Sequence, residues 1–536
     1  MKLNLHALRD ALQWRNAGFS LPSFDVDAMR QHTAKAPVWL HLGAGNIFRA
    51  FPAACLQALL DNGLWDKGVI VAECFDGEII DKAYTPFDCL SVLCVLKCDG
   101  TVEKKVIATV SEALRCDGHT PGDDQRLTEV LSSPSLQMVS LTITEKGYAV
   151  KNAKGQILPF IQADIENGPG KAASTMGKLT AGLYRRYLNG KAPLSLVSMD
   201  NCSANGDKLK AAVLCIAMGW SQLDLVNGAF VTWLMDEKKI AFPISMIDKI
   251  TPRPDAGVAR MLADCGFEDN DTIITGKNTY TAAFVNAEET EYLVVEDKFP
   301  AGRPPLEKAG IYFTDRETVD KTEKMKVCTC LNPLHTALAI LGCLLGHETI
   351  CNEMQDEDLR RMVYTLAYED AMPVVVNPGI LSPEKFAGEV LEKRLPNPFM
   401  PDAPQRIATD TSQKLPIRFG ETMKMYCKRE DLRLENLKVI PFVLAAWLRY
   451  LMALDDQLSP FTPSPDPLLD TMQAALSFLQ INGTVEKEQL KDVLSRSDIF
   501  GLNLYETPVA ETIVCWLNKM LQGKGAIRSA LKELLK

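Results

Sequence analysis

The sequence predicts an α/β protein with a Rossmann-type N-terminal domain and a mostly α-helical C-terminal domain. Three observations support this prediction. Apolar, strand-like segments alternate with helical segments early in the chain, a glycine turn joins the first strong strand to a helix, and strand candidates become rare after about residue 314. We therefore expect a dinucleotide-binding domain at residues 1–315, which includes an N-terminal extension over 1–36, and a helical, substrate-binding domain at residues 316–536.

The expected elements follow from the spacing of apolar residues. An amphipathic helix near residues 5–14 precedes the first strand at 38–42, which leads through the glycine turn into a helix over about 48–62. The next strand, GVIVAE, covers 68–73, and strand, turn, helix and strand in this order build parallel sheets. Further expected elements are buried strands at 137–144 and 194–199, a helix at 173–189 between them, and proline-rich loops at 395–404 and 459–467.

The composition excludes several classes of protein. The 536 residues include 68 acidic and 58 basic side chains, and the net charge of −10 does not suit a general nucleic-acid coat. The first residues lack the apolar segment of a secretory signal, and the longest apolar stretch, 336–346, is too short to span a bilayer. We predict a cytoplasmic monomer or small homo-oligomer that binds a small molecule and neither nucleic acid nor membrane.

The fifteen cysteines are numerous but include no CxxC pair, so zinc-ribbon and thioredoxin signatures are absent. Their odd number and wide spread fit reduced thiols in a cytoplasm better than a disulfide scaffold.

The glycine turn predicts a cofactor. Gly43 and Gly45 would let the backbone approach a pyrophosphate, and the start of the following helix offers free N–H donors, to which Arg49 could add a phosphate contact. Phe48 replaces the third glycine of the GxGxxG fingerprint, so an ordinary βα turn stays an alternative. The predicted cofactor-binding residues of this turn are Gly43, Gly45, Asn46, Ile47, Phe48 and Arg49.

Two carboxylates near the end of the second strand are candidates for binding the adenosine ribose. Glu73 ends GVIVAE and Asp76 follows three residues later, although the distance from the glycine turn is longer than usual. An acidic residue here would favour NAD over NADP, whose additional phosphate it would repel. A solvated strand end is the alternative for both residues.

A second group of polar residues lies in the sequence EKMKVCTCLNPLH, residues 323–335. Glu323 and Lys326 are three residues apart, as are Asn332 and His335, so each pair shares a helix face. A lysine close to an apolar segment can serve as a general base, and an asparagine can donate to a developing alkoxide. The alternative is a helix start in which Asn332 is a cap and His335 packs in the core.

Six segments in order resemble the long-chain mannitol dehydrogenase family. They are HLGAGNIFRAF at 41–51, LTITEKGY at 141–148, SMDN at 198–201 with Asn205 and Gly206, FPISMIDKITP at 242–252, VEDKF at 295–299 with GRP at 302–304, and the lysine, asparagine and histidine at 326–335. The resemblance implies a zinc-independent, NAD(P)-dependent oxidoreductase of polyols or uronates, with a Rossmann-type domain and a helical C-terminal domain.

The same resemblance implies roles for individual residues. Lys326 matches the family's catalytic lysine, a general acid in ketone reduction and a base in alcohol oxidation. Asn201 and Asn332 match the two asparagines that hold the reacting oxygen, and His335 matches the histidine that positions the substrate. Glu323 matches a glutamate that exchanges the proton with water. The residues that match substrate contacts are Asp248, Arg406 and Lys414.

One departure from the family pattern concerns the catalytic lysine. The family places it five residues before the second asparagine, but Lys326 is six before Asn332. One additional residue rotates a side chain by about 100° on an ideal α-helix. A π-bulge, or a helix that begins between the two residues, would restore the geometry. Lys324 is the alternative lysine.

The expected reaction is the reduction of a keto-uronate, D-fructuronate to D-mannonate, with NAD as the cofactor and no metal. An arginine such as Arg406 suits a substrate carboxylate, and the CTCLNPLHTA segment is more similar to the bacterial uronate enzymes than to the compact mannitol enzymes. Mannitol 2-dehydrogenase activity, tagaturonate reductase activity and a catalytically silent NAD-binding protein stay as alternatives. We expect Cys202, Cys328 and Cys330 to pack around the site as small apolar residues rather than to bind a metal.

Overall fold

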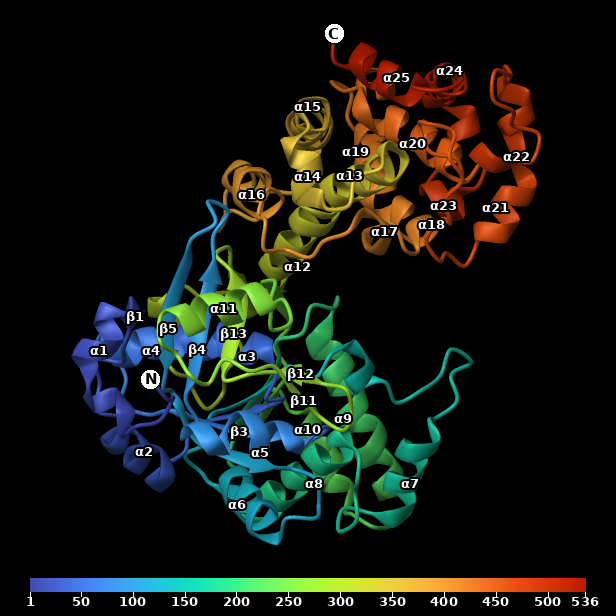
Figure 1. The fold of residues 1–536 in the computed structure, drawn as a ribbon. Helices are drawn as coiled ribbons and strands as arrows, with labels where there is room; N and C mark the ends of the chain where they lie inside the picture. Colours follow the sequence, from blue (N-terminus) through green and yellow to red (C-terminus); the bar gives the residue numbers. More distant parts are fainter. The chain divides into compact units, whose positions relative to one another are not determined.

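The computed structural model describes residues 1–536 and divides into two compact units. One unit comprises Met1–Lys97 and Thr101–Val319, and the other comprises Cys98–Gly100 and Asp320–Lys536. The first contains all the strands, and the second is built from helices and loops (Figure 1). The predicted fold class, a Rossmann-type domain followed by a helical domain, is therefore confirmed.

A six-stranded parallel sheet is the centre of the first unit. Its strands stand in the order β6 (Val110–Arg115), β3 (Val69–Glu73), β2 (Trp39–Leu42), β7 (Met138–Leu141), β8 (Leu194–Ser198) and β9 (Ile240–Ala241). The first strand, β2, lies inside the sheet, and the chain builds outward from it in both directions. In open sheets of this kind, ligands bind at the carboxyl ends of the strands where the order reverses, here at β2 and β7.

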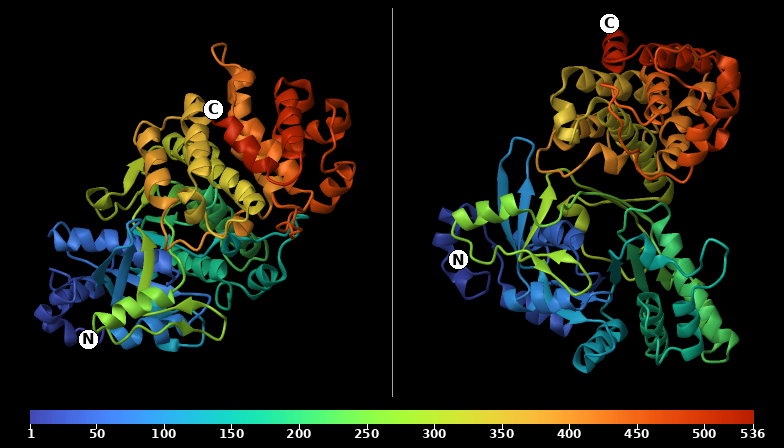
Figure 2. Two further views of the ribbon diagram at one scale, coloured as in Figure 1. Left: turned by 45° about the horizontal axis from the view of Figure 1, so that its top comes forward. Right: turned by 45° about the vertical axis from the view of Figure 1, so that its right-hand side comes forward.

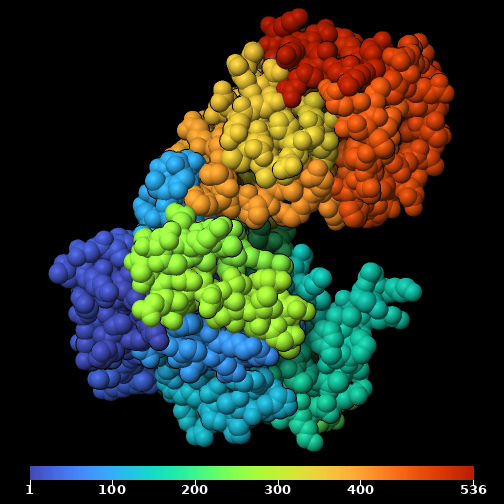
Figure 3. Space-filling view, viewed as in Figure 1, coloured from blue at the N-terminus to red at the C-terminus, as the bar shows by residue number.

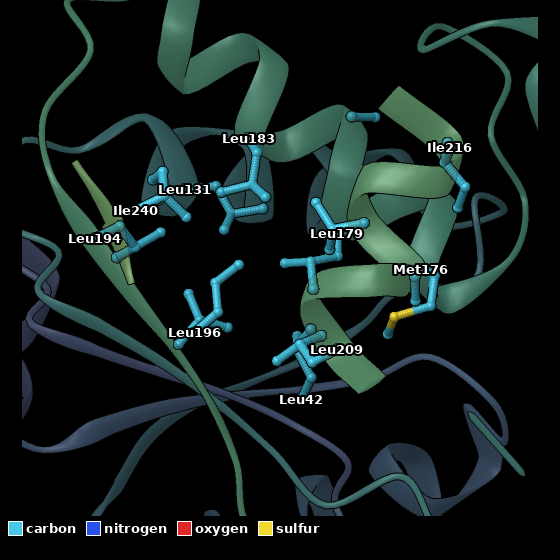
Figure 4. Packing of buried hydrophobic residues seen from close by; sticks show 14 of the residues in the cluster. Leu42, Leu131, Met176, Leu179, Leu183, Leu194, Leu196, Leu209, Ile216 and Ile240 are labelled. Carbon is cyan, nitrogen blue, oxygen red and sulfur yellow. The ribbon is translucent and has the colours of Figure 1, made fainter. Parts of the chain in front are cut away.

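Helices cover both faces of this sheet, which explains why its strands are apolar throughout. Alternate residues of each strand face opposite sides: Leu40 and Leu42 belong to one apolar cluster, whereas Trp39 belongs to the other. Figure 4 shows the first cluster, in which leucines of β2 and β8 meet side chains of α8 and α9. The helices of this face are α6 (Pro121–Ser132), α7 (Pro159–Asn167), α8 (Thr175–Leu188), α9 (Asn205–Gln222) and α10 (Gly228–Met235). Those of the other face are α2 (Val26–Lys35), α3 (Asn46–Ala50), α4 (Pro52–Asp61) and α5 (Glu78–Ala83).

The prediction of one continuous helix over residues 48–62 was wrong, because the helix is interrupted. The structure has two helices, α3 and α4, separated at Phe51, whose backbone leaves helical geometry at φ −126° and ψ −72°. Pro52 explains the interruption, because its ring disfavours the α-helical conformation for the residue before it. The first helix is therefore short: it begins directly after Gly45 and ends at Ala50.

Smaller sheets complete the first unit and were not predicted, because most pair segments that are distant in the sequence. One joins β1 (Phe19–Ser20), β5 (Val102–Ile107), β4 (Ser91–Leu96) and β13 (Phe284–Glu288). Another joins β10 (Ser245–Asp248), β14 (Tyr292–Glu296) and β15 (Tyr312–Thr314), and β11 (Ile273–Ile274) pairs with β12 (Tyr280–Thr281). The unit's remaining helices are α1 (Ala11–Asn16) and α11 (Ala256–Asp264). Residues 151–157 form an exposed loop that projects from the surface, as Figure 3 shows.

The second unit has helix α13 (Asn332–Leu345) in its core, and residues Leu334 and Thr336–Leu344 of this helix are buried. Figure 2 shows the unit's other helices from two further directions. They are α12 (Arg316–Lys324), which begins in the first unit, α14 (Ile350–Gln355), α15 (Glu357–Thr365), α16 (Pro383–Glu389), α17 (Pro404–Ile407), α18 (Thr411–Leu415), α19 (Glu421–Lys428), α20 (Val439–Tyr450), α21 (Leu469–Ala475), α22 (Lys491–Leu494), α23 (Ser497–Phe500), α24 (Val509–Met520) and α25 (Ala526–Leu534).

Four short π-helical segments interrupt or extend these helices. They are η5 (Met325–Cys330), η6 (Leu366–Ala371), η8 (Val390–Arg394) and η9 (Pro416–Gly420). Segment η5 packs against both η6 and η9. Segments of π-helix are rare and occur often at functional sites, so this grouping marks one region of the helical unit.

The helical run over Arg316–Leu345 is long and apolar enough to cross a membrane by length and composition. However, 78% of its most apolar window is buried inside the protein. Its apolar character is therefore that of a core helix.

Candidate active site

The glycine turn after β2 needs its two glycines for different reasons. Gly43 has φ 107°, and a Cβ atom there would lie 2.3 Å from the carbonyl oxygen of Thr142 on the neighbouring strand's loop. Gly45 has an ordinary φ of −78°, and no atom lies within 4 Å of the position of its Cβ. The first glycine is thus required by the fold, whereas the second leaves open space of the kind that a pyrophosphate needs.

Phe48, which replaces the third glycine of the fingerprint, packs beneath the turn. Its ring stacks on the imidazole of His41, with the ring centres 4.0 Å apart. The His41 nitrogens pair with the hydroxyl groups of Ser140 and Thr142, at 2.6 and 2.9 Å. Burial lowers the pKa of His41 to about 3, so the imidazole is neutral. In most folds of this kind, a third glycine lets the helix pack closely on the strand. Here the stacked rings of His41 and Phe48 fill that position and support the turn.

The carboxylate of Glu73 joins the ends of two strands. Its Oε2 accepts the Ala44 N–H at 2.7 Å, and its Oε1 accepts the N–H groups of Phe75 and Asp76 at 2.8 and 3.1 Å. The Asp76 carboxylate accepts the hydroxyl groups of Thr275 and Thr279, both at 2.6 Å. Both predicted ribose ligands are buried at the expected strand end, and both already hold the loops around the turn. Their contact with a ribose stays a prediction.

Arg49 is also buried, and its guanidinium group is turned into the protein. It donates to the Ala282 carbonyl oxygen, to the Thr281 hydroxyl and to the Asn46 side chain, each at 2.8 Å. These bonds fix α3 to the loop before β13. The structure thus shows a positioning role for Arg49 and Asn46, whereas Ile47 lies partly buried beside them; their contacts with a phosphate stay predictions.

The segment Ser198–Asn205 ties three strand ends together. Asp200 accepts the N–H groups of Ile143 and Thr144 at 2.9 Å and the Tyr148 hydroxyl at 2.5 Å, and this holds Thr144 at φ 65°. The burial of Asp200 raises the pKa of its carboxyl group. Asn201 follows in an exposed bend beyond the carboxyl end of β8. The neighbouring aspartate therefore orders the loop that carries this predicted oxygen-binding residue.

Asn205 and Gly206 of the same segment both have structural roles. The Asn205 side chain donates to the carbonyl oxygens of Asp200 and Ser245 and accepts the Ser245 N–H, at 2.9 to 3.0 Å. Gly206 has no room for a side chain, because a Cβ would lie 2.5 Å from the Pro243 carbonyl oxygen. Strand β10 is thereby fastened to the end of β8, and β10 ends at the buried Asp248.

In the helical unit, the departure in spacing between Lys326 and Asn332 has a structural explanation. Lys326 lies in the π-helical segment η5, and its carbonyl oxygen accepts the Leu331 N–H five residues later, at 3.1 Å. Leu331 leaves helical geometry at φ −130°, and α13 begins anew at Asn332. Both devices that the sequence suggested, a π-bulge and a new helix start, are present. The wider turn accommodates the additional residue.

The side chains around this segment differ in exposure. Lys326 is 3% exposed, Glu323 and Asn332 are half-buried, and Lys324 is exposed. Thr329 in the same segment bonds back to the Met325 carbonyl oxygen at 2.7 Å. The buried lysine and the half-buried asparagine fit the chemistry predicted for them, and Lys324 does not.

His335 lies one turn into α13 among charged residues. Its Nε2 is 3.6 Å from the Asp402 carboxylate, which is also paired with Arg406. Burial lowers the pKa of His335 to about 4; Asp402 opposes this effect, whereas Arg394, Arg418 and Arg406 reinforce it. The imidazole is therefore neutral at pH 7 and can both donate and accept a hydrogen bond.

The two residues of the predicted basic pair from the C-terminal domain, Arg406 and Lys414, differ in their exposure to solvent. The Arg406 side chain is 64% exposed, whereas Lys414 is half-buried and donates to the carbonyl oxygens of Ile407 (3.0 Å) and Thr409. Burial and the nearby Arg418 lower the pKa of Lys414. Both residues lie in the helical unit, and their contact with a substrate stays a prediction.

The sequence analysis did not identify three charged residues near His335, which are Arg394, Asp402 and Arg418. Arg418 donates to the Thr336 hydroxyl at 2.5 Å, and burial lowers its pKa to about 10. Helical spacing could have indicated two of them, since Arg418 is four residues after Lys414 and Asp402 is four before Arg406. The position of Arg394 depends on tertiary packing, which local spacing does not show.

The cysteines beside Lys326 have the properties of packing residues. Cys330 is buried and points to the Pro383 carbonyl oxygen, and burial raises the pKa of Cys328 to about 11 and that of Cys330 to about 12. No group of three or more histidine, cysteine, aspartate or glutamate side chains is arranged to hold a metal ion.

Comparison with family models and known proteins shows which proteins this chain is similar to. Residues 38–308 match the family model of the mannitol dehydrogenase Rossmann domain, and residues 318–521 match that of the mannitol dehydrogenase C-terminal domain. The D-mannonate oxidoreductase of Thermotoga maritima is 47% identical over 538 residues, covering 100% of this chain and 99% of the relative.

Solved structures are similar over nearly the whole chain. Mannitol 2-dehydrogenase of Pseudomonas fluorescens, in a ternary complex with NAD and D-mannitol, gives a TM-score of 0.69 at 25% identity and covers 100% of this chain and 99% of its own. A substrate-free D-sorbitol dehydrogenase gives a TM-score of 0.79 at 24% identity, covers 97% of this chain and 99% of its own, and supports the fold.

The Rossmann unit and the family models together define an oxidoreductase that acts on CH–OH groups with NAD(P). The chain belongs to the mannitol dehydrogenase family.

The two glycines of the turn give a matched pair of variants. Gly43→Ala should lower the free energy of unfolding by about 2 kcal/mol, because the added methyl group meets the Thr142 backbone. Gly45→Ala should fold like the wild type but raise the KM for the NAD(P) cofactor, because its methyl group would enter the open space predicted to hold the pyrophosphate. Urea unfolding measures the stability of each variant, and titration with NADH and with NADPH measures the KM for the cofactor. Equal destabilisation of the two variants would contradict this account of the turn.

A pH titration tests the environment of His335. We expect its imidazole to titrate near pH 4 rather than 6.5. Because the folded pKa is lowered, the unfolded chain binds more protons between these values, so this histidine's contribution to stability is present above pH 6.5 and is lost as the pH falls through 4. Proton NMR of the six histidines, with His335→Gln for assignment, measures the midpoint. A midpoint near 6.5 would refute the buried, neutral imidazole.

Proposed function

We propose that this protein reduces D-fructuronate to D-mannonate with NADH. The observation that carries the proposal is the 47% identity with the Thermotoga maritima D-mannonate oxidoreductase over the full length of both chains. The positive charge near His335 supports it, because the guanidinium groups of Arg394 and Arg418 accompany Lys414 and Arg406. A keto-uronate carries a carboxylate that such groups recognise, whereas a neutral polyol does not need them.

In this proposal, Lys326 supplies the proton that the forming alkoxide needs. Bound NADH supplies the hydride to the carbonyl carbon. Asn201 and Asn332 hold the oxygen and stabilise its developing charge, and Glu323, one helical turn from Lys326, returns a proton from water to the lysine. His335, neutral and close to Asp402, positions a substrate hydroxyl. Asp248, Arg406 and Lys414 complete the substrate contacts.

NAD rather than NADP is the proposed cofactor. Glu73 and Asp76 place two acidic side chains at the carboxyl end of β3, beside the glycine turn. A ribose 2′-phosphate would approach both, and this repulsion disfavours NADP. We also propose a cytoplasmic location, which agrees with fifteen cysteines that are all free thiols.

A substrate panel tests the proposed function. NADH oxidation should be fast with D-fructuronate and slow with D-tagaturonate and D-fructose, and NADPH should be a poor substitute. Preference for D-fructose would establish a mannitol 2-dehydrogenase, and preference for D-tagaturonate would establish a tagaturonate reductase. NADH binding without turnover of any ketone would overturn the proposal in favour of a catalytically silent NAD-binding protein.

A further inference from the structure

Two cysteines stand side by side at the carboxyl edge of the parallel sheet. Cys74 directly follows β3 and Cys116 directly follows β6. The two strands are parallel neighbours, with Glu73 opposite Arg115, and the Cys116 N–H donates to the Glu73 carbonyl oxygen at 2.8 Å. The next register position therefore pairs Cys74 with Cys116.

Both thiols lie on the same face of the sheet. Ile70 and Ala72, which lie four and two residues before Cys74, belong to the apolar cluster beneath α6 and α8. Leu114, two residues before Cys116, belongs to the same cluster. Cys116 belongs to this cluster and Cys74 packs against it. Neighbouring strands are about 4.8 Å apart, which lies within the Cα separation of about 4.4–6.8 Å that a disulfide spans. A bond between these sulfurs requires little movement of the strands.

The two thiols differ in their surroundings, although a hydrogen bond joins them. The Lys178 ammonium group, which donates to the Cys116 carbonyl oxygen at 2.5 Å, lowers the pKa of Cys116. By contrast, burial raises the pKa of Cys94 and Cys343 to about 12. Cys116 lies beside Lys178 and lines a cavity that Cys74 does not line, so we take it as the attacking thiol.

Cys116, although only 2% exposed, borders a cavity. This cavity of about 1010 Å³ is also lined by His119 and Lys178. Helices α6 and α8 contribute most of the other lining residues. The cavity has the size of a typical small-molecule site.

We propose that Cys74 and Cys116 form a reversible disulfide on reaction with low-molecular-weight disulfides, of which glutathione disulfide is the probe. The Cys116 thiolate attacks one sulfur of the reagent, forms a mixed disulfide and releases one thiol. The Cys74 thiolate then attacks the Cys116 sulfur and releases the second thiol. The protein pair loses two electrons and two protons, and the reagent gains both as two thiols. Reversible disulfides of this kind occur in reducing compartments as sensing devices.

The bond would reach the cofactor end of the sheet. Cys74 adjoins Glu73, whose carboxylate holds the Ala44 N–H of the glycine turn. Closing the disulfide ties β3 to β6 beside Glu73. Even a small displacement of its carboxylate would weaken the hydrogen bond to Ala44, so the KM for NADH should rise several-fold while kcat changes little. This second effect rests on the proposed function, whereas the disulfide itself does not.

The test treats the native, full-length protein with glutathione disulfide at neutral pH, alkylates the remaining thiols and maps the peptides by mass spectrometry. We expect one cross-linked pair that contains Cys74 and Cys116, lost on treatment with dithiothreitol. Cys74→Ser should trap the mixed disulfide on Cys116, and Cys116→Ser should give neither product at this site.

The matched control is the double variant Cys427→Ser and Cys515→Ser, which removes the two exposed cysteines of the helical unit and should keep the cross-link. A cross-link only after denaturation, or none at all, would overturn the proposal. A mixed disulfide trapped on Cys74 in Cys116→Ser would overturn the assignment of the nucleophile. A cross-link with an unchanged KM for NADH would refute the coupling to the glycine turn and leave the disulfide site standing.

Discussion

A buried lysine in an apolar helix is the constraint on which the proposed chemistry depends. Lys326 is 3% exposed, and α13, which follows it, is the core of the helical unit. Placing an amine in such a position is costly unless nearby groups compensate for its lost hydration. The chain departs from regular α-helix at this point: it widens into a π-helical segment, breaks at Leu331 and starts again at Asn332. The irregular backbone lets a core helix carry polar groups.

In the Rossmann unit, buried polar side chains order the loops by forming hydrogen bonds with backbone groups. Glu73 fixes the glycine turn, Asp200 fixes the loop after β7, and Asn205 fixes the end of β8 to β10. Each is a buried polar side chain whose hydrogen bonds go to loops rather than to solvent. Several residues of the family motifs therefore order the carboxyl edge of the sheet, where Asn201 is exposed and Gly45 borders open space.

The sequence was sufficient to predict the central fold because its strongest signals are local. The strand over 38–42, the glycine turn and the GVIVAE strand appear within one or two residues of their predicted places. The break at Phe51 was missed although Pro52 indicated it. The smaller sheets were missed because their pairing joins segments far apart in the chain, such as β4 and β13. Arg394 joins the surroundings of His335 for the same reason, since tertiary packing alone determines its place.

The proposed role of Lys326 is tested most directly by single-turnover reduction of the proposed substrate, D-fructuronate, with bound NADH in Lys326→Ala, with Lys324→Ala as the control. Lys324 is exposed and lies two residues away, so both variants remove one lysine side chain from the same helical run. The account predicts that Lys326→Ala slows the reaction by about 10²–10⁴-fold while the Kd for NADH stays near the wild-type value, and that Lys324→Ala reacts normally. An unchanged rate in Lys326→Ala, or an equal loss in Lys324→Ala, would contradict it.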